Sequence, residues 1–273
     1  MTNNNILQDL SSQSVALALD ANIIAYNTLF SSLPQAELHN DEGLLWFETG
    51  IDSGIFNGVL QTRQKPEELP VAIERVLIHF QQRNLPFHWH VGPSSHPTDI
   101  GNLLESYDIC HDEDLPGMAV DLLRLKEDIR IASNLIIHPV TTDELLHQWT
   151  STWGCGAPDE EIQRWFMVYS GLSFGPERPL RLYLGTIDEK PVATVALFLE
   201  AGVASINWVV TIPEFRHQGI GAAMTLMAAR EARSVGYRVG VLVASPMGIN
   251  VYRRLGFSEC CVVSAYEWNP TGS

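Results

Sequence analysis

The stretch that decides the fold runs from Ile206 to Met224 and reads INWVVTIPEFRHQGIGAAM. Its first half is an apolar, β-branched run that is typical of a buried strand, and Pro213 ends it because proline cannot donate a ladder hydrogen bond. A glycine-bearing turn from Arg216 to Gly221 follows, and then a run of good helix formers from Ala222 to Arg233. The sequence therefore predicts strand, turn and helix in direct succession.

This succession is typical of a phosphate cradle. The free N–H groups of the first helical turn and the positive end of the helix dipole face an anion. Gly219 and Gly221 let the backbone approach a ligand closely, and Arg216 adds a charge-assisted donor. A Walker A loop is excluded because no Gly-Lys-Ser/Thr follows. The dinucleotide fingerprint is excluded because Met224 stands where it needs a third glycine.

The segment from Arg216 to Gly221 resembles the R/Q-x-x-G-x-G/A motif of the GCN5-related N-acetyltransferases, the GNAT superfamily, which binds the pyrophosphate of acetyl-CoA. Downstream, Gly236 is typical of a helix end, and a strand is expected from Arg238 to Ala244. The phrase from Val251 to Phe257, VYRRLGF, looks like the Y-x-x-x-G-F segment of the same family. The alternative is an α/β domain with an ordinary glycine turn.

The resemblance implies transfer of an acetyl group from acetyl-CoA to an amine by direct attack. Tyr252 aligns with the general acid that protonates the departing thiolate, although it could also be an aromatic residue that packs the last helix. Ser245 stands where many family members carry an asparagine, which leaves that contact open. The residues implied in cofactor binding are Val209, Val210, Thr211, Arg216, His217, Gln218, Gly219, Ile220, Gly221, Ala222 and Ser245.

The general base is left open by the sequence. The strand that bears Trp208 offers Asn207 and no acid, whereas many family members carry a carboxylate there. The candidates are Glu177, Glu200 and Glu214, or a chain of waters. A ping-pong route through Cys155 is a minor alternative, and a non-catalytic acyl-CoA-binding regulatory module is the second functional hypothesis.

The N-terminal half repeats this order of elements. We expect strands at 44–48, 55–61, 86–91 and 118–125, helices at 66–83 and 99–106, and two helices within 6–30 that split near Asp20. With a shift of about 150 residues, Val59 falls on Val209, and the helix from Pro66 falls on the cradle helix. The phrase FHWHVGPSSHPTDIGNLL also resembles the degenerate first domain of tandem GNAT proteins.

The expected fold is therefore α/β, an α+β arrangement on a mixed sheet, with two GNAT-like domains at residues 1–130 and 134–273. The charged segment from Lys126 to Asn134 is the expected linker. In the first copy, Pro66, Leu69 and Val71 take the places of the cradle arginine and glycines, and Asn102 takes the place of the tyrosine. This domain is expected to be non-catalytic.

The second domain is expected to open with a strand at 135–139, followed by a helix capped by Thr141 or Thr142 and a second helix from Pro158 to Gly171. A hairpin at 181–186 and 192–200 then leads to the strand of the cradle. Four aromatic residues flank a loop that covers the acceptor in GNAT enzymes, and they either line a pocket or pack a core. They are Trp149, Trp153, Trp165 and Phe166.

Composition limits the partners and the compartment. The formal net charge of −15, from 32 acidic and 17 basic residues, argues against nucleic acid and favours the approach of a cationic amine acceptor. No apolar run is long enough for a membrane helix, and the N-terminus lacks the basic region of a signal peptide. The four cysteines form no disulfide framework, so a cytoplasmic protein is expected, as a monomer or a dimer.

Histidines are scattered through the first half. His88 and His90 alternate on one expected strand, and His79, His96 and His111 lie elsewhere. No carboxylate or cysteine joins them at ligand spacing, so the sequence favours no metal site.

Overall fold

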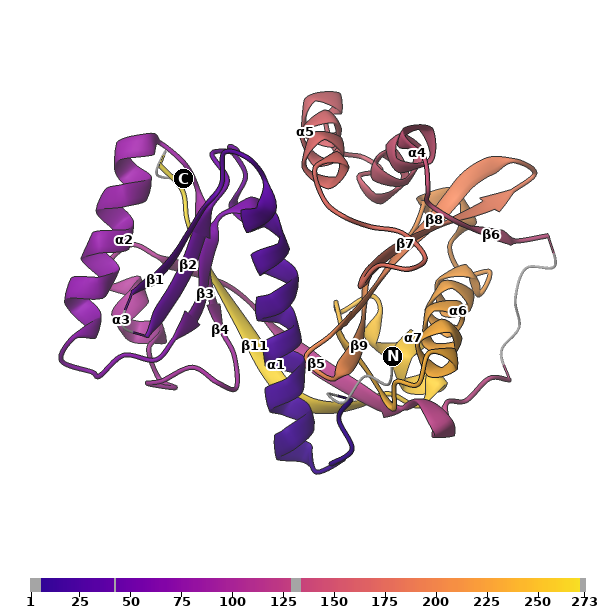
Figure 1. Cartoon of the computed structure of the whole chain (residues 1–273), viewed down its shortest axis with the longest axis horizontal. Helices are drawn as coiled ribbons and strands as arrows, with labels where there is room; N and C mark the ends of the chain where they lie inside the picture. Colours follow the sequence, from indigo (N-terminus) through magenta and orange to yellow (C-terminus); the bar gives the residue numbers. More distant parts are fainter. Residues whose placement is uncertain (1–5, 42, 129–133, 271–273) are drawn as a thin grey trace. The chain divides into compact units, whose positions relative to one another are not determined.

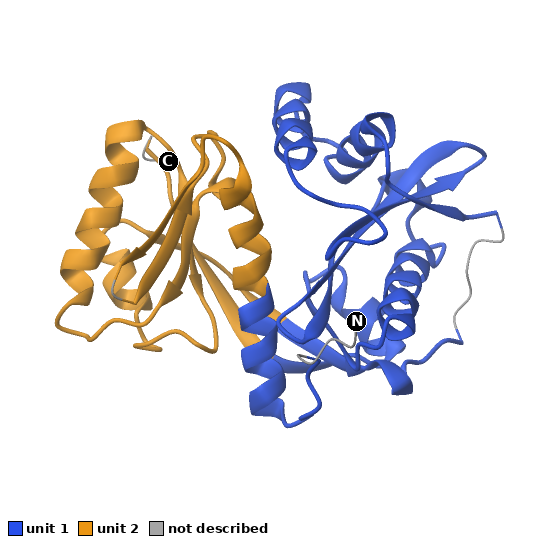
Figure 2. Ribbon diagram, viewed as in Figure 1, with its two compact units in different colours: residues 1–22, 117–260 blue, residues 23–116, 261–273 orange. Residues whose placement is uncertain are grey.

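The computed structural model describes residues 6–41, 43–128 and 134–270 (Figure 1). Two compact units divide the chain, residues 1–22 with 117–260 (unit 1) and residues 23–116 with 261–273 (unit 2) (Figure 2). Neither unit is continuous in the sequence, whereas we expected a single boundary between residues 130 and 134. Much of the expected linker, residues 129–133, lies outside the described residues.

Strand pairing explains this discontinuity. Within β5 (Cys110–Asp121), residues 117–121 pair with β10 (Val239–Val243) of unit 1. Within β11 (Ser258–Trp268), residues 264–268 pair with β4 (Phe87–Val91) of unit 2. Helix α1 (Ser12–Thr28) likewise contributes residues to both units.

Unit 1 is a mixed sheet in the order β5-β10-β9-β8-β7-β6. Its remaining strands are β6 (Ile136–Pro139), β7 (Leu180–Ile187), β8 (Lys190–Glu200) and β9 (Val203–Thr211). Its helices are α4 (Asp143–Trp153), α5 (Asp159–Ser170), α6 (Ile220–Ser234) and α7 (Ile249–Leu255), with 3₁₀ turns η3 (Leu122–Arg124) and η4 (Pro213–Phe215). Strands β9 and β10 are parallel, and the other pairs are antiparallel.

The core of unit 1 forms around β8. Every residue from Val192 to Leu199 is buried, so both faces of this strand are covered. Helices α4 and α6 both pack against β8 and β9. The expected cap of α4 is confirmed, because Thr142 Oγ1 accepts a hydrogen bond from the Leu145 N–H at 3.2 Å.

Unit 2 has the strand order β1-β2-β3-β4-β11. Its other strands are β1 (Glu37–Asp41), β2 (Leu44–Glu48) and β3 (Gly58–Thr62). Its helices are α2 (Leu69–Arg83) and α3 (Gly101–Glu105), with 3₁₀ turns η1 (Leu29–Ser32) and η2 (Gly54–Phe56). Strands β3 and β4 are parallel. One face of α2 joins the core through Ile73, Val76 and Phe80.

The expected repeat is confirmed. In each unit a strand leads through a 15-residue helix to a parallel neighbour, β9-α6-β10 in unit 1 and β3-α2-β4 in unit 2. Both halves are thus built on the α/β, mixed-sheet plan that was expected. Among the helices of the described residues, none is long and apolar enough to cross a membrane.

Several expected boundaries were wrong. The helix expected from Pro66 begins at Leu69, and Pro70 lies in its first turn. One helix, α1, replaces the two expected, because Asp20 is buried within it and does not end it. The strand expected at 118–125 starts at Cys110 and ends at Asp121, whose carboxylate accepts from the Leu123 N–H at 3.1 Å and opens η3.

Candidate functional site

The predicted succession of strand, turn and helix is present at the end of β9. Gly219 has φ +79°, a left-handed conformation that glycine adopts without steric cost, and His217 also has a positive φ of 63°. The hydrogen bond from the Ala223 N–H to the Gly219 carbonyl, at 3.0 Å, closes the first turn of α6. The N–H groups of residues 220–222 therefore precede the helical ladder and point out of its positive end.

Gly221 keeps the space in front of these N–H groups open. A Cβ added there would lie 3.7 Å from Thr211 Oγ1 and 3.9 Å from Val209 Cγ1. The bare side of Gly221 therefore faces the end of β9, and a side chain would fill the gap between helix and strand. Arg216 Nε donates to the Thr211 carbonyl at 3.0 Å, which holds the guanidinium at the same strand end. This combination fits a phosphate-bearing ligand.

An irregularity in β9 exposes its main chain beside the turn. Thr194 pairs with Val210 and Ala196 pairs with Asn207, so β9 carries an extra residue there, and Trp208 has φ +53°. Thr194 Oγ1 donates to the Trp208 carbonyl at 2.8 Å and fixes this bulge. The pairing of β9 with β10 is confined to residues 204 and 205, so the two parallel strands diverge beyond that point. An extended ligand arm could pair with the main chain of residues 207–211.

Tyr252 lies on α7 with only 8% of its surface exposed, and this burial raises the pKa of its phenol to about 12. Its ring packs edge-on to Phe257 at 6.0 Å. A Cβ at Gly248 would lie 2.8 Å from the ring, so this glycine is needed for the contact. Within the described residues, no group accepts a hydrogen bond from the Tyr252 hydroxyl. The phenol is therefore protonated at neutral pH and can serve as a proton donor.

Ser245 is engaged in local structure. Its Oγ accepts a hydrogen bond from the Gly248 N–H at 3.2 Å, and its carbonyl accepts from the N–H groups of Gly248 and Ile249. These bonds hold the turn that leads into α7. The hydroxyl thus helps to place Tyr252.

A general base is no clearer than it was from the sequence. Glu177, Glu200 and Glu214 are all exposed, and no described hydrogen bond or ion pair joins them to Tyr252. The amide of Asn207 donates to Ser205 Oγ at 2.8 Å. Cys155 is half-buried and packs against the core of unit 1.

The aromatic residues of α4 and α5 form a cluster that reaches the β9 bulge. Trp153 lies 4.4 Å from Trp165 and 4.6 Å from Trp208, ring centroid to ring centroid. Trp149 and Trp165 are buried, and within the described residues their indole N–H groups lack a hydrogen-bond partner. Trp153 and Trp208 are half-buried. Phe166 contacts His147 at 5.4 Å and lies outside the cluster.

The equivalent strand edge in unit 2 is closed. After β4, the His96 N–H donates to the Thr62 carbonyl at 2.8 Å, and the Gln64 N–H donates to the His96 carbonyl at 3.1 Å. Trp89 Nε1 also donates to Thr62 Oγ1 at 2.9 Å. The chain beyond β4 therefore occupies the edge of β3 that corresponds to the open edge of β9. No local sequence pattern predicts this closure, because it depends on contacts between residues about 30 apart.

Comparisons with known proteins agree with this geometry. Residues 140–257 match the model described as the acetyltransferase (GNAT) family. Among curated proteins no sequence matches. The chain is similar in structure to a GCN5-related N-acetyltransferase from Kribbella flavida, with a TM-score of 0.73, 19% identity, and coverage of 94% of this chain and 97% of that chain.

Two further solved structures share the fold of both halves. A tandem GNAT protein from the clavulanic acid biosynthesis pathway has a TM-score of 0.59 and 15% identity, with 97% of each chain covered. A functionally unknown conserved protein from Staphylococcus epidermidis has a TM-score of 0.64 and 16% identity, with coverage of 85% of this chain and 92% of that chain. The expected resemblance and the tandem arrangement are thus confirmed.

Proposed function

Because residues 140–257 carry a domain of the GNAT family, we propose that this chain is an N-acetyltransferase that moves an acetyl group from acetyl-CoA to a primary amine. The acceptor would be a small molecule, a peptide or a protein. The observation that carries the proposal is the open turn at the start of α6, where residues 220–222 present free N–H groups beside the bare face of Gly221.

Cofactor binding is assigned to two neighbouring segments. The turn from Arg216 to Ala222 would hold the pyrophosphate through its N–H groups and the helix dipole, with Arg216 adding positive charge. The unpaired edge of Val209, Val210 and Thr211 would pair with the pantetheine arm through main-chain groups. Ser245 would contribute indirectly, because its hydroxyl holds the turn before α7.

Tyr252 is the proposed general acid. The amine attacks the thioester carbonyl, the C–N bond forms, and the C–S bond breaks as the phenol gives its proton to the sulfur. A main-chain N–H of the β9 edge would stabilise the oxyanion that forms on the way. The phenol of Tyr252 keeps its proton across the physiological range, so a proton is available when the thiolate leaves.

The proton of the amine is assigned to a chain of waters, since β9 offers Asn207 and no acid beside the reacting centre. The chain's net charge of −15 supports an acceptor that carries positive charge before it is deprotonated. Because the edge of β3 is closed, we assign no cofactor site to unit 2. Unit 2 would then shape the substrate site or support the enzyme without binding acetyl-CoA.

The same lack of an evident base favours a second candidate, a non-catalytic module that binds acyl-CoA. Both the enzyme and the non-catalytic module would bind the cofactor, but only the enzyme would turn it over. A screen of amine acceptors with acetyl-CoA, followed by free thiol release, separates them, because only the enzyme releases CoA in an acceptor-dependent way.

Calorimetric titration of acetyl-CoA tests the shared part of both proposals. We expect one site per chain in the wild type and none in Arg216→Glu. Arg230→Glu is the matched control, because it makes the same charge change about 15 Å from the start of α6. It removes the ion pair of Arg230 with Glu127, so its folding is checked by thermal unfolding, and it should keep binding. Two sites per chain would contradict the assignment of unit 2, and no binding by the wild type would overturn the function.

A further inference from the structure

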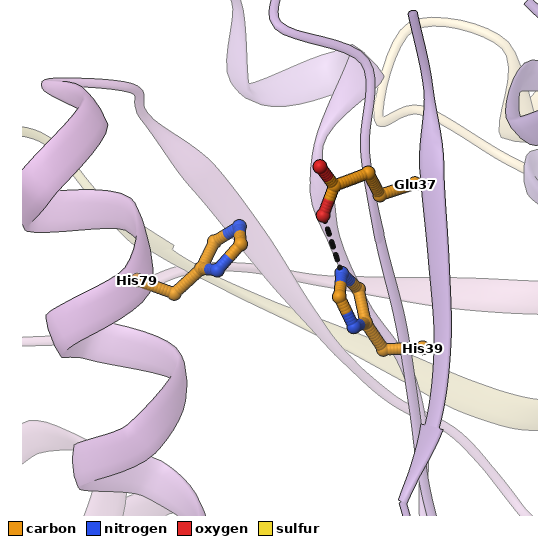
Figure 3. Close-up of side chains that lie close together, drawn as sticks. All are labelled: Glu37, His39 and His79. Carbon is orange, nitrogen blue, oxygen red and sulfur yellow. Dashed lines mark hydrogen bonds and ion pairs between the residues drawn. The ribbon is translucent and has the colours of Figure 1, made fainter.

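Three side chains from two elements that are distant in sequence converge in unit 2, and Figure 3 shows them together. Glu37 and His39 lie two residues apart on β1, so they share one face of this strand, and His79 comes from α2. One ligating atom from each lies within 4.8 Å of the other two. Nε2 of His39 is 3.2 Å from Oε2 of Glu37.

Both imidazole rings are held in place by packing. The His39 ring lies flat on the Trp46 indole, with centroids 3.7 Å apart and planes at 6°. The His79 ring meets both of them edge-on, at 4.6 Å from Trp46 and 5.4 Å from His39. Rings that are already oriented lose little freedom when they bind a ligand.

A buried carboxylate lies beside His79 and positions its ring. Glu48, from β2, accepts at His79 Nε2, and the two side chains are only 10% and 15% exposed. Arg83 Nε in turn holds the Glu48 carboxylate at 3.0 Å. A carboxylate on a histidine nitrogen is the arrangement that orients histidine ligands around metals.

We propose that Glu37, His39 and His79, with Glu48 as their partner, bind a divalent transition-metal ion, with Zn²⁺ as the best match. Two imidazole nitrogens and carboxylate oxygens are the donors that zinc prefers, whereas Ca²⁺ and Mg²⁺ require oxygen ligands. Zn–N and Zn–O bonds of about 2.0–2.2 Å place tetrahedral ligands roughly 3.4 Å apart. Glu37 and His39 already have this spacing at 3.2 Å, and His79 would approach them by at most about 1.4 Å on binding.

Such an ion would join strands β1 and β2 to helix α2 within unit 2. It is independent of the acyl-transfer site, since all four residues belong to the other unit. Sequence spacing could not reveal it, because the positions 37, 39, 48 and 79 follow no ligand motif and meet only through the β1–β2 pairing and the packing of α2.

The test is zinc binding by the full-length chain after treatment with EDTA. We expect one tightly bound Zn²⁺ per chain by calorimetry and by elemental analysis after gel filtration, with a rise in melting temperature. The double variant His39→Ala/His79→Ala should lose at least 100-fold in zinc affinity. Glu48→Gln should lose about 10- to 100-fold.

Two further variants control for misfolding and for zinc binding at a second site. Glu37→Gln changes an exposed edge-strand residue, so it should fold normally, as checked by circular dichroism, and still bind zinc more weakly. His88→Ala is the matched control, because His88 belongs to a separate group with Asp112 and Glu267 that holds only one histidine. It should bind zinc as the wild type does.

Several results would overturn the proposal. They are the absence of zinc in the wild type, equal binding by the double variant, or loss of zinc in His88→Ala. X-ray absorption at the zinc edge should show nitrogen and oxygen neighbours with an imidazole signature. A sulfur neighbour would assign the metal to cysteines and contradict the site.

Discussion

Replacing Gly221 by alanine in one variant and by leucine in another should separate the stability of helix α6 from its ability to bind an anion. The backbone of Gly221 is helical, so alanine can adopt it without strain. The added Cβ would be in ordinary contact, 3.7 Å from Thr211 Oγ1 and 3.9 Å from Val209 Cγ1. The fold should therefore accept the change.

The expected effects on helix stability and on acetyl-CoA affinity have opposite signs. Alanine is favoured over glycine within a helix by up to about 1 kcal/mol, so the melting temperature should stay the same or rise by roughly 2–4 °C. The R/Q-x-x-G-x-G/A motif allows alanine at this position, so Gly221→Ala should keep acetyl-CoA binding. The longer side chain of Gly221→Leu would instead fill the gap between α6 and the end of β9, beside the N–H groups of residues 220–222. Losing one hydrogen bond to a charged group costs about 1.5–3 kcal/mol, which corresponds to acetyl-CoA binding roughly 10- to 150-fold more weakly.

The assay combines calorimetric titration of acetyl-CoA with thermal unfolding of the same samples. Ser234→Ala, at the exposed C-terminal end of the same helix, is the control and should change neither measurement by much. Unchanged cofactor affinity in Gly221→Leu would refute the placement of the pyrophosphate at this turn. A large fall in melting temperature would show that the open space is needed by the fold itself.

Three further changes test other parts of unit 1. Tyr252→Phe should lower kcat by about 10²–10⁴-fold with little change in acetyl-CoA affinity. In a pH–rate profile of the wild type, ionisation of Tyr252 should cause no loss of activity until the pH approaches its pKa of about 12. Asp121→Asn should lower the free energy of unfolding by about 1–3 kcal/mol, because Asp121 accepts two bonds from Arg238 at 2.6 and 2.8 Å. These bonds hold the pKa of Asp121 in the folded protein below its usual value of 3.8. Their contribution to the free energy of unfolding is therefore present above pH 3.8 and is lost as the pH falls through the folded-state pKa. Urea unfolding between about pH 2 and 7 would measure this loss. Gly154→Ala should cost about 1–3 kcal/mol in thermal unfolding, since its Cβ would lie 2.4 Å from the Trp165 ring; an unchanged melting temperature would contradict the packing of α4 on α5.

The cradle was predictable because its signals are local. An apolar strand, Pro213, the left-handed Gly219 and a run of helix formers each act on their own neighbourhood, and α6 begins two residues before the expected start. The cap at Thr142 was predictable for the same reason. Tyr252 was placed on its helix correctly, but its burial, which sets its pKa, depends on packing against Gly248 and Phe257.

Long-range pairing was not predictable. Strand β5 begins with exposed polar and charged residues from Cys110 to Asp114, which hide its periodicity, and β1 was missed because three of its five residues are exposed. The bulge at Trp208 depends on register with β8, and the closure by His96 depends on a segment that follows β4. None of these contacts leaves a signal within one segment.

The discontinuous units have a consequence for synthesis of the chain. Unit 2 is encoded mostly before residue 117, yet β4 gains its second neighbour only from residues 264–268. At a synthesis rate of about 5–20 residues per second, the roughly 150 intervening residues take about 7–30 s to emerge. During that interval an apolar strand edge on β4 stands unpaired on the ribosome-bound chain, in a state prone to association with other chains.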